Sequence, residues 1–199
     1  MHFKPYQLLV LSSLIFATLH AEEAVIQPET PAAPAANVAP VAPVEMAEEE
    51  IIELIGYLTA QGGGVASLQL EKESIIALAE GVQKGLSGEL NLMEMPEAEV
   101  EAAFVEAQAR AEAVQAGSEE LPAISATALE KIGLVIVMQS GLQQLGFGGD
   151  EAGLIRKGFI DGALDAAPDP DLEAKMPALQ AYMQPRVQAA QAEMMRAQA

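Results

Sequence analysis

The sequence predicts an all-α protein in which two three-helix repeats pack against each other as a pseudo-dimer within one chain. Apolar residues recur at three- and four-residue spacings from residue 48 onward, which is the period of an amphipathic helix. No stretch alternates with period two for long enough to form a strand. The same pattern of apolar residues and glycines returns after 77 residues, which indicates an internal repeat.

Length and charge restrict the possible partners. The chain has 199 residues, room for one domain or two small ones, and carries 29 acidic against 10 basic side chains, a net charge of -19. Binding to nucleic acid or to anionic lipid requires clustered Lys and Arg, so neither is expected as a partner. The longest apolar run after residue 21, at residues 132–138, is too short to span a bilayer.

Residues 1–21 have the layout of a secretory signal peptide, with an early lysine, an apolar run over residues 8–16 and a final segment from Ala17 to Ala21. We expect cleavage after Ala21 and an exported protein, periplasmic or secreted. Both histidines, His2 and His20, lie in this segment, and the chain contains no cysteine. The exported chain lacks the side chains of a His- or Cys-based catalytic pair or a zinc site, so no catalytic residue, metal or cofactor is expected.

Residues 22–45 are rich in Ala, Pro, Val and Glu and show no apolar periodicity. Such a composition cannot bury enough apolar surface to offset the entropy lost on ordering. We therefore expect a semi-extended, disordered linker between the signal peptide and the folded part of the chain.

The first repeat, residues 46–117, is expected to contain three helices. The first begins at Glu48, where three consecutive glutamates favour a helix N-terminus, and its apolar spacing continues to Leu68. The second contains the periodic apolar run over residues 75–82. The third begins at Pro96, since proline is favoured at the first helical position, and is rich in Ala and Glu.

The second repeat, residues 124–199, has the same order of elements. An apolar helix is expected over residues 128–145, and a second amphipathic helix over residues 150–164. A turn at residues 168–171 precedes a third helix, which runs from Leu172 toward the end of the chain and is rich in Ala, Gln and Met.

The internal repeat is the strongest single signal in the sequence. A shift of 77 residues aligns seven identical residues without a gap, and four of them are glycines; the alternative is chance self-alignment of a Gly- and Ala-rich chain. Glycine costs about 1 kcal/mol relative to alanine inside a helix, so its recurrence suggests close approach of two backbones. We expect the first helices of the two repeats to pack on each other through such glycines, across an approximate two-fold axis. The residues expected to mediate helix packing are Gly56, Gly64, Leu68, Gly81, Gly133, Gly141, Leu145 and Gly158.

Short motifs in both repeats have a family resemblance. The first repeat reads Gly-Val-Gln-Lys-Gly-Leu-Ser-Gly at residues 81–88, and the second reads Gly-Phe-Ile-Asp-Gly-Ala-Leu at residues 158–164. Each repeat resembles the helical N-terminal domain of exported FKBP-type peptidyl-prolyl isomerases, the Mip-like and FkpA-like proteins, whose second helix ends in Gly-apolar-x-Asp-Ala-Leu-x-Gly. Lys84 stands in place of the family's Asp, and Leu164 lies one residue late with no closing Gly.

The resemblance implies dimerisation through interlaced helices and an association with holding unfolded chains. The family's catalytic domain, a β-sheet module of roughly a hundred residues with an aromatic pocket, has no room in this sequence, so we expect no enzyme. We therefore expect an exported interaction module with a dimerisation or chaperone-like role in protein folding in the cell envelope. Its partners would be a further copy, unfolded clients or a separate isomerase. The alternative is a part of an isomerase system whose catalytic domain is lost or supplied by another chain.

Two further groups of residues have alternative interpretations. The acidic residues 161, 165, 169 and 171 could attract calcium, but they lack the Asp-x-Asp-x-Asp-Gly order of a calcium loop, which favours a solvated turn. Methionines on predicted helix faces are typical of helix contacts and, less often, of adaptable binding grooves. These methionines are Met138, Met176, Met183, Met194 and Met195.

Overall fold

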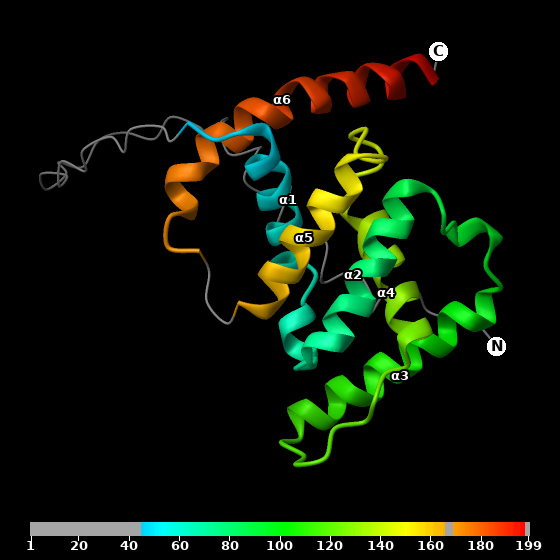
Figure 1. Ribbon diagram of the computed structural model, residues 1–199. Helices are drawn as coiled ribbons and strands as arrows, with labels where there is room; N and C mark the ends of the chain where they lie inside the picture. Colours follow the sequence, from blue (N-terminus) through cyan, green and yellow to red (C-terminus); the bar gives the residue numbers. More distant parts are fainter. Residues whose placement is uncertain (1–44, 166–168, 198–199) are drawn as a thin grey trace, which may run out of the picture.

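The computed structural model describes residues 45–165 and 169–197, and within these two ranges it contains α-helices and short 3-10 helices but no strand (Figure 1). The prediction of an all-α protein is therefore confirmed. The expected signal peptide and all but the last residue of the expected linker lie outside the described residues. The elements are α1 (Glu48–Gly62), η1 (Val65–Leu68), α2 (Lys72–Ser87), η2 (Leu92–Glu94), α3 (Glu97–Gln115), α4 (Ala126–Ser140), α5 (Glu151–Leu164) and α6 (Leu172–Ala197).

Local sequence explains where the first helix of each half begins. At α1 the backbone N–H of Ala47 donates a hydrogen bond to the carboxylate of Glu50 at 2.9 Å, and the three glutamates of the first turn face the positive end of the helix dipole. At α4 the N-cap is Ser125, whose hydroxyl accepts a hydrogen bond from the backbone N–H of Ala128 at 3.3 Å.

Both of these helices end earlier than the apolar spacing predicts. Gly64 and Gly141 have φ of 69° and 71°, in the left-handed region that glycine adopts most easily and that terminates a helix. The chain then turns back, so that Val65 and Leu142 are buried, at 3% and 4% exposure. The apolar residues beyond each glycine therefore reach the core from the 3-10 helix η1 and from a turn at residue 142, and not, as predicted, from a continuing α-helix.

Among the described residues, every extensive contact between two α-helices joins the first half of the chain, α1 to α3, to the second half, α4 to α6. In the described ranges α1 packs mainly on α5, α2 packs on α4 and α5, α3 packs on α4, and α6 packs on α1. Figure 1 shows α1 and α5 crossing at the centre of the molecule, beside α2 and α4. The expectation that the two first helices pack on each other is wrong: each lies on the second helix of the other half.

The core lies between the two halves. Leu78 and Val82 on α2, and Ile155 and Phe159 on α5, are all 0% exposed. The second pair follows the first by 77 residues, so the same positions of the two second helices fill the centre. Burial of side chains of this size contributes about 1.5–3 kcal/mol each, which makes the contact between halves the main source of stability.

The two third helices are both attached through an arginine. On α3, Arg110 is 8% exposed and donates hydrogen bonds to the carbonyls of Leu68, Gln69 and Pro122 at 2.7, 2.7 and 2.8 Å. On α6, Arg186 donates to the carbonyl of Gly146 at 3.4 Å. Gly146 follows Gln69 by 77 residues, and both have positive φ, so the two arginines hold equivalent turns.

The long helix α6 is held to the rest of the molecule by a polar cluster. Arg186 also pairs with Glu151 at the start of α5 and stacks on the Phe147 ring at 4.2 Å. The Tyr182 hydroxyl lies 3.0 Å from a carboxylate oxygen of Glu48 on α1, and burial raises the pKa of Tyr182, as does its hydrogen bond to Glu48. Prolines at positions 177 and 185 each remove a backbone donor, and Figure 1 shows that α6 bends.

Candidate functional site

Glycines allow the helices of the two halves to lie directly on each other. A Cβ atom at Gly56 of α1 would come closer than 3.0 Å to the carbonyl group of Ile155 on α5. At Gly133 of α4, the residue 77 positions later, a Cβ atom would come equally close to the carbonyl oxygen of Leu78 on α2. At both positions the added Cβ atom would be closer to a carbonyl group than real Cβ atoms come to any neighbour, so only glycine fits at either crossing.

The same crossings contain glycines on the opposite helix. A Cβ atom at Gly158 of α5 would lie 2.6 Å from the carbonyl carbon of Glu53 on α1. At Gly81 of α2 the corresponding distance, to the carbonyl carbon of Glu130 on α4, is also 2.6 Å. The two crossings therefore have the same contacts at an offset of 77 residues.

Polar contacts at the two crossings are similar but not identical. Lys84 on α2 pairs with Glu130 at 2.9 Å, and Lys157 on α5 pairs with Glu53 at 2.6 Å. The hydrogen bond to Glu130 raises the pKa of the Lys84 ammonium group. Lys84 thus supplies an ion pair between the halves.

Glutamine side chains also tie the halves together. The amide of Gln143 donates to the carbonyl of Gly85 at 2.6 Å, and the amide of Gln61 donates to the carbonyl of Gly162 at 2.6 Å. Gly85 and Gly162 are absent from the predicted packing residues, although both belong to the repeated glycines that could have identified them. A Cβ atom at Gly162 would lie 2.8 Å from the Cα atom of Tyr57.

Two predicted packing glycines have a different role. Gly64 and Gly141 lie beyond the ends of α1 and α4 with positive φ, and a Cβ atom at Gly141 would meet no atom within 4 Å. Gly141 is required by backbone conformation and not by a helix crossing, which corrects the expectation for this residue. Leu68 and Leu145 are partly buried and pack against the core.

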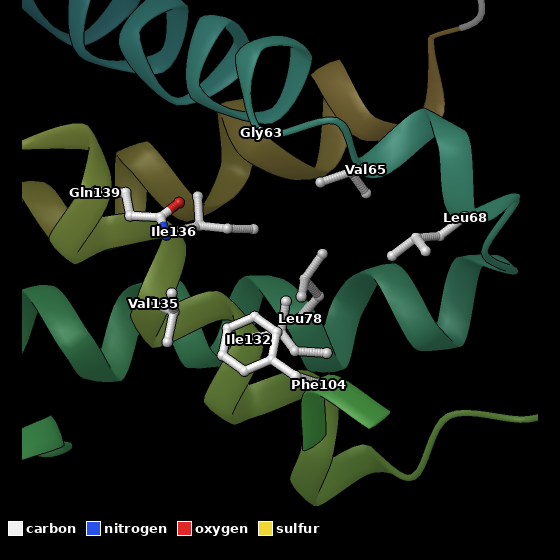
Figure 2. A pocket seen from close by; sticks show the side chains of 9 residues that line it. All are labelled: Gly63, Val65, Leu68, Leu78, Phe104, Ile132, Val135, Ile136 and Gln139. Atoms are coloured by element: carbon white, nitrogen blue, oxygen red, sulfur yellow. The ribbon is translucent and has the colours of Figure 1, made fainter. Parts of the chain in front are cut away.

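A cavity of about 100 Å³ lies where the two halves meet on one side (Figure 2). It is bounded by the end of α1 and by η1, α2, α3 and α4. Gln139, an exposed residue on α4, is the one polar side chain in its lining. The apolar side chains around the cavity include Val65, Leu68, Leu78, Phe104, Ile132 and Ile136.

The wall that α3 contributes to this cavity has an acidic outer surface. Glu101 and Glu97 precede Phe104 by three and seven residues, so they share its side of the helix, and both are exposed. Neither forms an ion pair in the described ranges. The basic residue of α3, Arg110, is turned inward to backbone carbonyls, so the solvent side of α3 carries negative charge only.

A second cavity, of about 380 Å³, lies between α1, α5 and the start of α6, and acidic residues make up half of its lining. Asp161 and Asp169 from the acidic cluster line it, together with Lys175. Lys175 pairs with Asp169 at 2.6 Å, and this hydrogen bond lowers the pKa of the Asp169 carboxyl group. Among the described residues, no group of three or more His, Cys, Asp or Glu side chains has the geometry to hold a metal ion.

The methionines divide between exposed and packed positions. Met183 packs against the core, whereas Met138 on α4 is 41% exposed. Three others on α6 are exposed, namely Met176, Met194 and Met195.

Within the two described ranges, no helix combines the length and hydrophobicity needed to cross a membrane. No protein-family model, curated protein or solved structure matches the chain.

Proposed function

We propose that this chain is an exported helical interaction module with a chaperone-like role in protein folding in the cell envelope, and not an enzyme. In this proposal the two repeats, which resemble FKBP N-terminal domains, form a pseudo-dimer within one chain. The observation that carries the proposal is the reciprocal set of glycine crossings, in which Gly56 and Gly133 contact equivalent positions of the opposite half.

The distribution of contacts supports the pseudo-dimer. In the part of the chain that the structure describes, the α-helices of one half have their extensive contacts with helices of the other half, so the helices of a single half do not form a core among themselves. In a protein with one such repeat, a second chain would have to supply the missing surface. Here the connection between α3 and α4 keeps the second half near the first at an effective concentration on the order of millimolar.

The surface supports an interaction role. The apolar cavity beside α3 offers a place for an apolar group, and the net charge of -19 keeps the protein soluble while it holds one. The signal-like pattern of residues 1–21 supports export.

Assembly and holding activity can be measured separately. Light scattering of the chain is expected to give the mass of one 20.9 kDa chain or of its cleaved form. A protease site inserted between Ser118 and Glu119, both exposed, should allow cleavage without loss of helicity, while each half isolated in urea should fail to refold alone. A stable dimer of whole chains, or a half that folds alone, would contradict the pseudo-dimer.

The holding role predicts that the chain slows aggregation of a reductively unfolded protein at equimolar concentration. A proline-isomerisation assay on a tetrapeptide tests the alternative of an isomerase, and we expect the uncatalysed rate. No effect on aggregation would contradict the chaperone-like role, and catalysis by pure protein would favour the alternative.

A further inference from the structure

We propose that the apolar cavity between η1, α3 and α4 binds one bulky aliphatic side chain of an unfolded polypeptide, at a position flanked by Lys or Arg. This inference rests on the proposed function, because it names the class of segment that the interaction module recognises. It commits to a protein segment with an apolar anchor and basic neighbours.

Size and lining select the anchor. A volume of about 100 Å³ exceeds the roughly 30 Å³ that one water molecule occupies and is smaller than the roughly 150 Å³ apolar cavity known to bind benzene. Gln139 is the one polar side chain in the lining, so an apolar group suits this space better than water, which requires two to four polar partners. A side chain of four non-hydrogen atoms, such as that of Leu, Ile or Met, matches this space.

Charge selects the residues beside the anchor. Phe104 forms part of the cavity wall, and Glu101 and Glu97 extend from it along the same side of α3 without ion-pair partners in the described ranges. Lys131 on α4, next to the cavity residue Ile132, is already paired with Glu99 at 2.7 Å. A segment with its anchor in the cavity would therefore place neighbouring Lys or Arg side chains against uncompensated carboxylates, whereas acidic neighbours would be repelled.

The absence of cysteine from the chain allows a removable plug at the cavity edge. In the full chain carrying Gln139→Cys, a butyl group attached by disulfide exchange would occupy the cavity, and reductant would release it. Met93→Cys, at a position 88% exposed on η2, carries the same butyl group as the matched control. Circular dichroism checks that all forms remain folded.

The probes are short Gly/Ser peptides that contain Lys-Leu-Lys, Glu-Leu-Glu or Lys-Ala-Lys, titrated by NMR at low salt. A single anchor should bind weakly, with Kd on the order of millimolar. We expect Lys-Leu-Lys to shift the amide signals of Val65, Leu68 and Ile132, and to bind at least about tenfold more tightly than the other two peptides. The butyl group at position 139 should weaken binding at least about tenfold, reductant should restore it, and the group at position 93 should have no effect.

Two results would overturn the inference: equal binding of Lys-Leu-Lys to the plugged and unplugged protein, or no binding by the unplugged protein. Equal binding of Glu-Leu-Glu would overturn the charge preference. If the plugged protein still slows aggregation as the free protein does, the proposed function stands and the cavity is not its site. If neither form slows aggregation, the proposed function itself fails.

Discussion

Gly158 on α5 lies against the backbone of Glu53 on α1 so closely that a Cβ atom at position 158 would be 2.9 Å from the Glu53 Cα atom. At the other crossing the corresponding distance, from a Cβ atom at Gly81 to the Glu130 Cα atom, is 2.6 Å. Gly81 precedes Gly158 by 77 residues, and Glu130 follows Glu53 by 77 residues. Since backbone atoms cannot move away as a flexible side chain can, these crossings depend on the missing Cβ.

Gly158→Ala should destabilise the protein by about 3 kcal/mol or more, because the two helices must separate to admit the methyl group. Gly153→Ala is the matched control on the same helix, since a Cβ atom there would meet nothing within 4 Å. That change should be neutral or stabilise by up to about 1 kcal/mol through helix propensity. Urea denaturation measures both, and equal effects of the two substitutions would argue against a tight crossing.

Gly141→Ala should cost about 1–2 kcal/mol, because alanine in the left-handed region is strained although the space around it is open. Gly141→Leu should cost about the same, since the added atoms meet no neighbour within 4 Å of the Cβ position. A leucine variant much less stable than the alanine variant, in thermal or urea unfolding, would instead indicate overpacking.

Gln69→Gly should stabilise the protein by about 1 kcal/mol. Gln69 has φ of 46°, the one positive value outside glycine in the described ranges, whereas the equivalent turn of the second half has Gly146. The reverse change, Gly146→Gln, should destabilise by a similar amount, and urea midpoints of the two variants should therefore move in opposite directions.

Arg110→Lys should destabilise the protein by about 2–3 kcal/mol. The planar guanidinium bonds three carbonyls at once, and a lysine ammonium on a different stem cannot reproduce that fork, which leaves buried acceptors without a donor. Chemical denaturation should detect the loss, and limited proteolysis should locate it near Leu68 and Pro122. An unchanged midpoint would mean that water replaces these bonds without cost.

Acid should weaken the start of α6 through Asp169. The hydrogen bonds from Lys175 and from the backbone N–H of Asp171 lower the pKa of Asp169 below 3.8, so the folded state favours the carboxylate. Ionised Asp169 therefore stabilises the folded protein above pH 3.8, and this contribution to the free energy of unfolding is lost as the pH falls through the folded-state pKa. The effect should be below about 1 kcal/mol, since the pair is partly exposed.

Asp169→Asn is the test of this linkage. The variant should be slightly less stable than the parent at pH 6, and the difference should shrink as the pH falls below 3.8, as measured by thermal unfolding at a series of pH values. A constant difference at all pH values would exclude titration of Asp169 as the cause.

Helical periodicity by itself determined the fold class and the order of the helices. The glutamates before Ile51 and the proline before α3 mark the starts of helices, because capping and dipole effects act within one turn. The 77-residue repeat also predicts close backbone approach at Gly56, Gly81, Gly133 and Gly158, and a Cβ atom at each of them would come closer than 3.0 Å to the backbone of another helix. Glycine in a helix interior destabilises that helix, so glycines that recur at one spacing indicate positions where another backbone comes close.

Only the tertiary structure decided which helices meet. A repeated glycine shows that some backbone comes close, but it does not specify whether that backbone belongs to the other first helix or to the other second helix. Gly64 and Gly141 have the same sequence signal as Gly56 and Gly133, yet they adopt positive φ and end helices, because glycine serves close approach and left-handed conformation equally well. The inward turn of Arg110 and the cavity beside Phe104 likewise depend on residues far apart in the chain, whose distances no local pattern encodes.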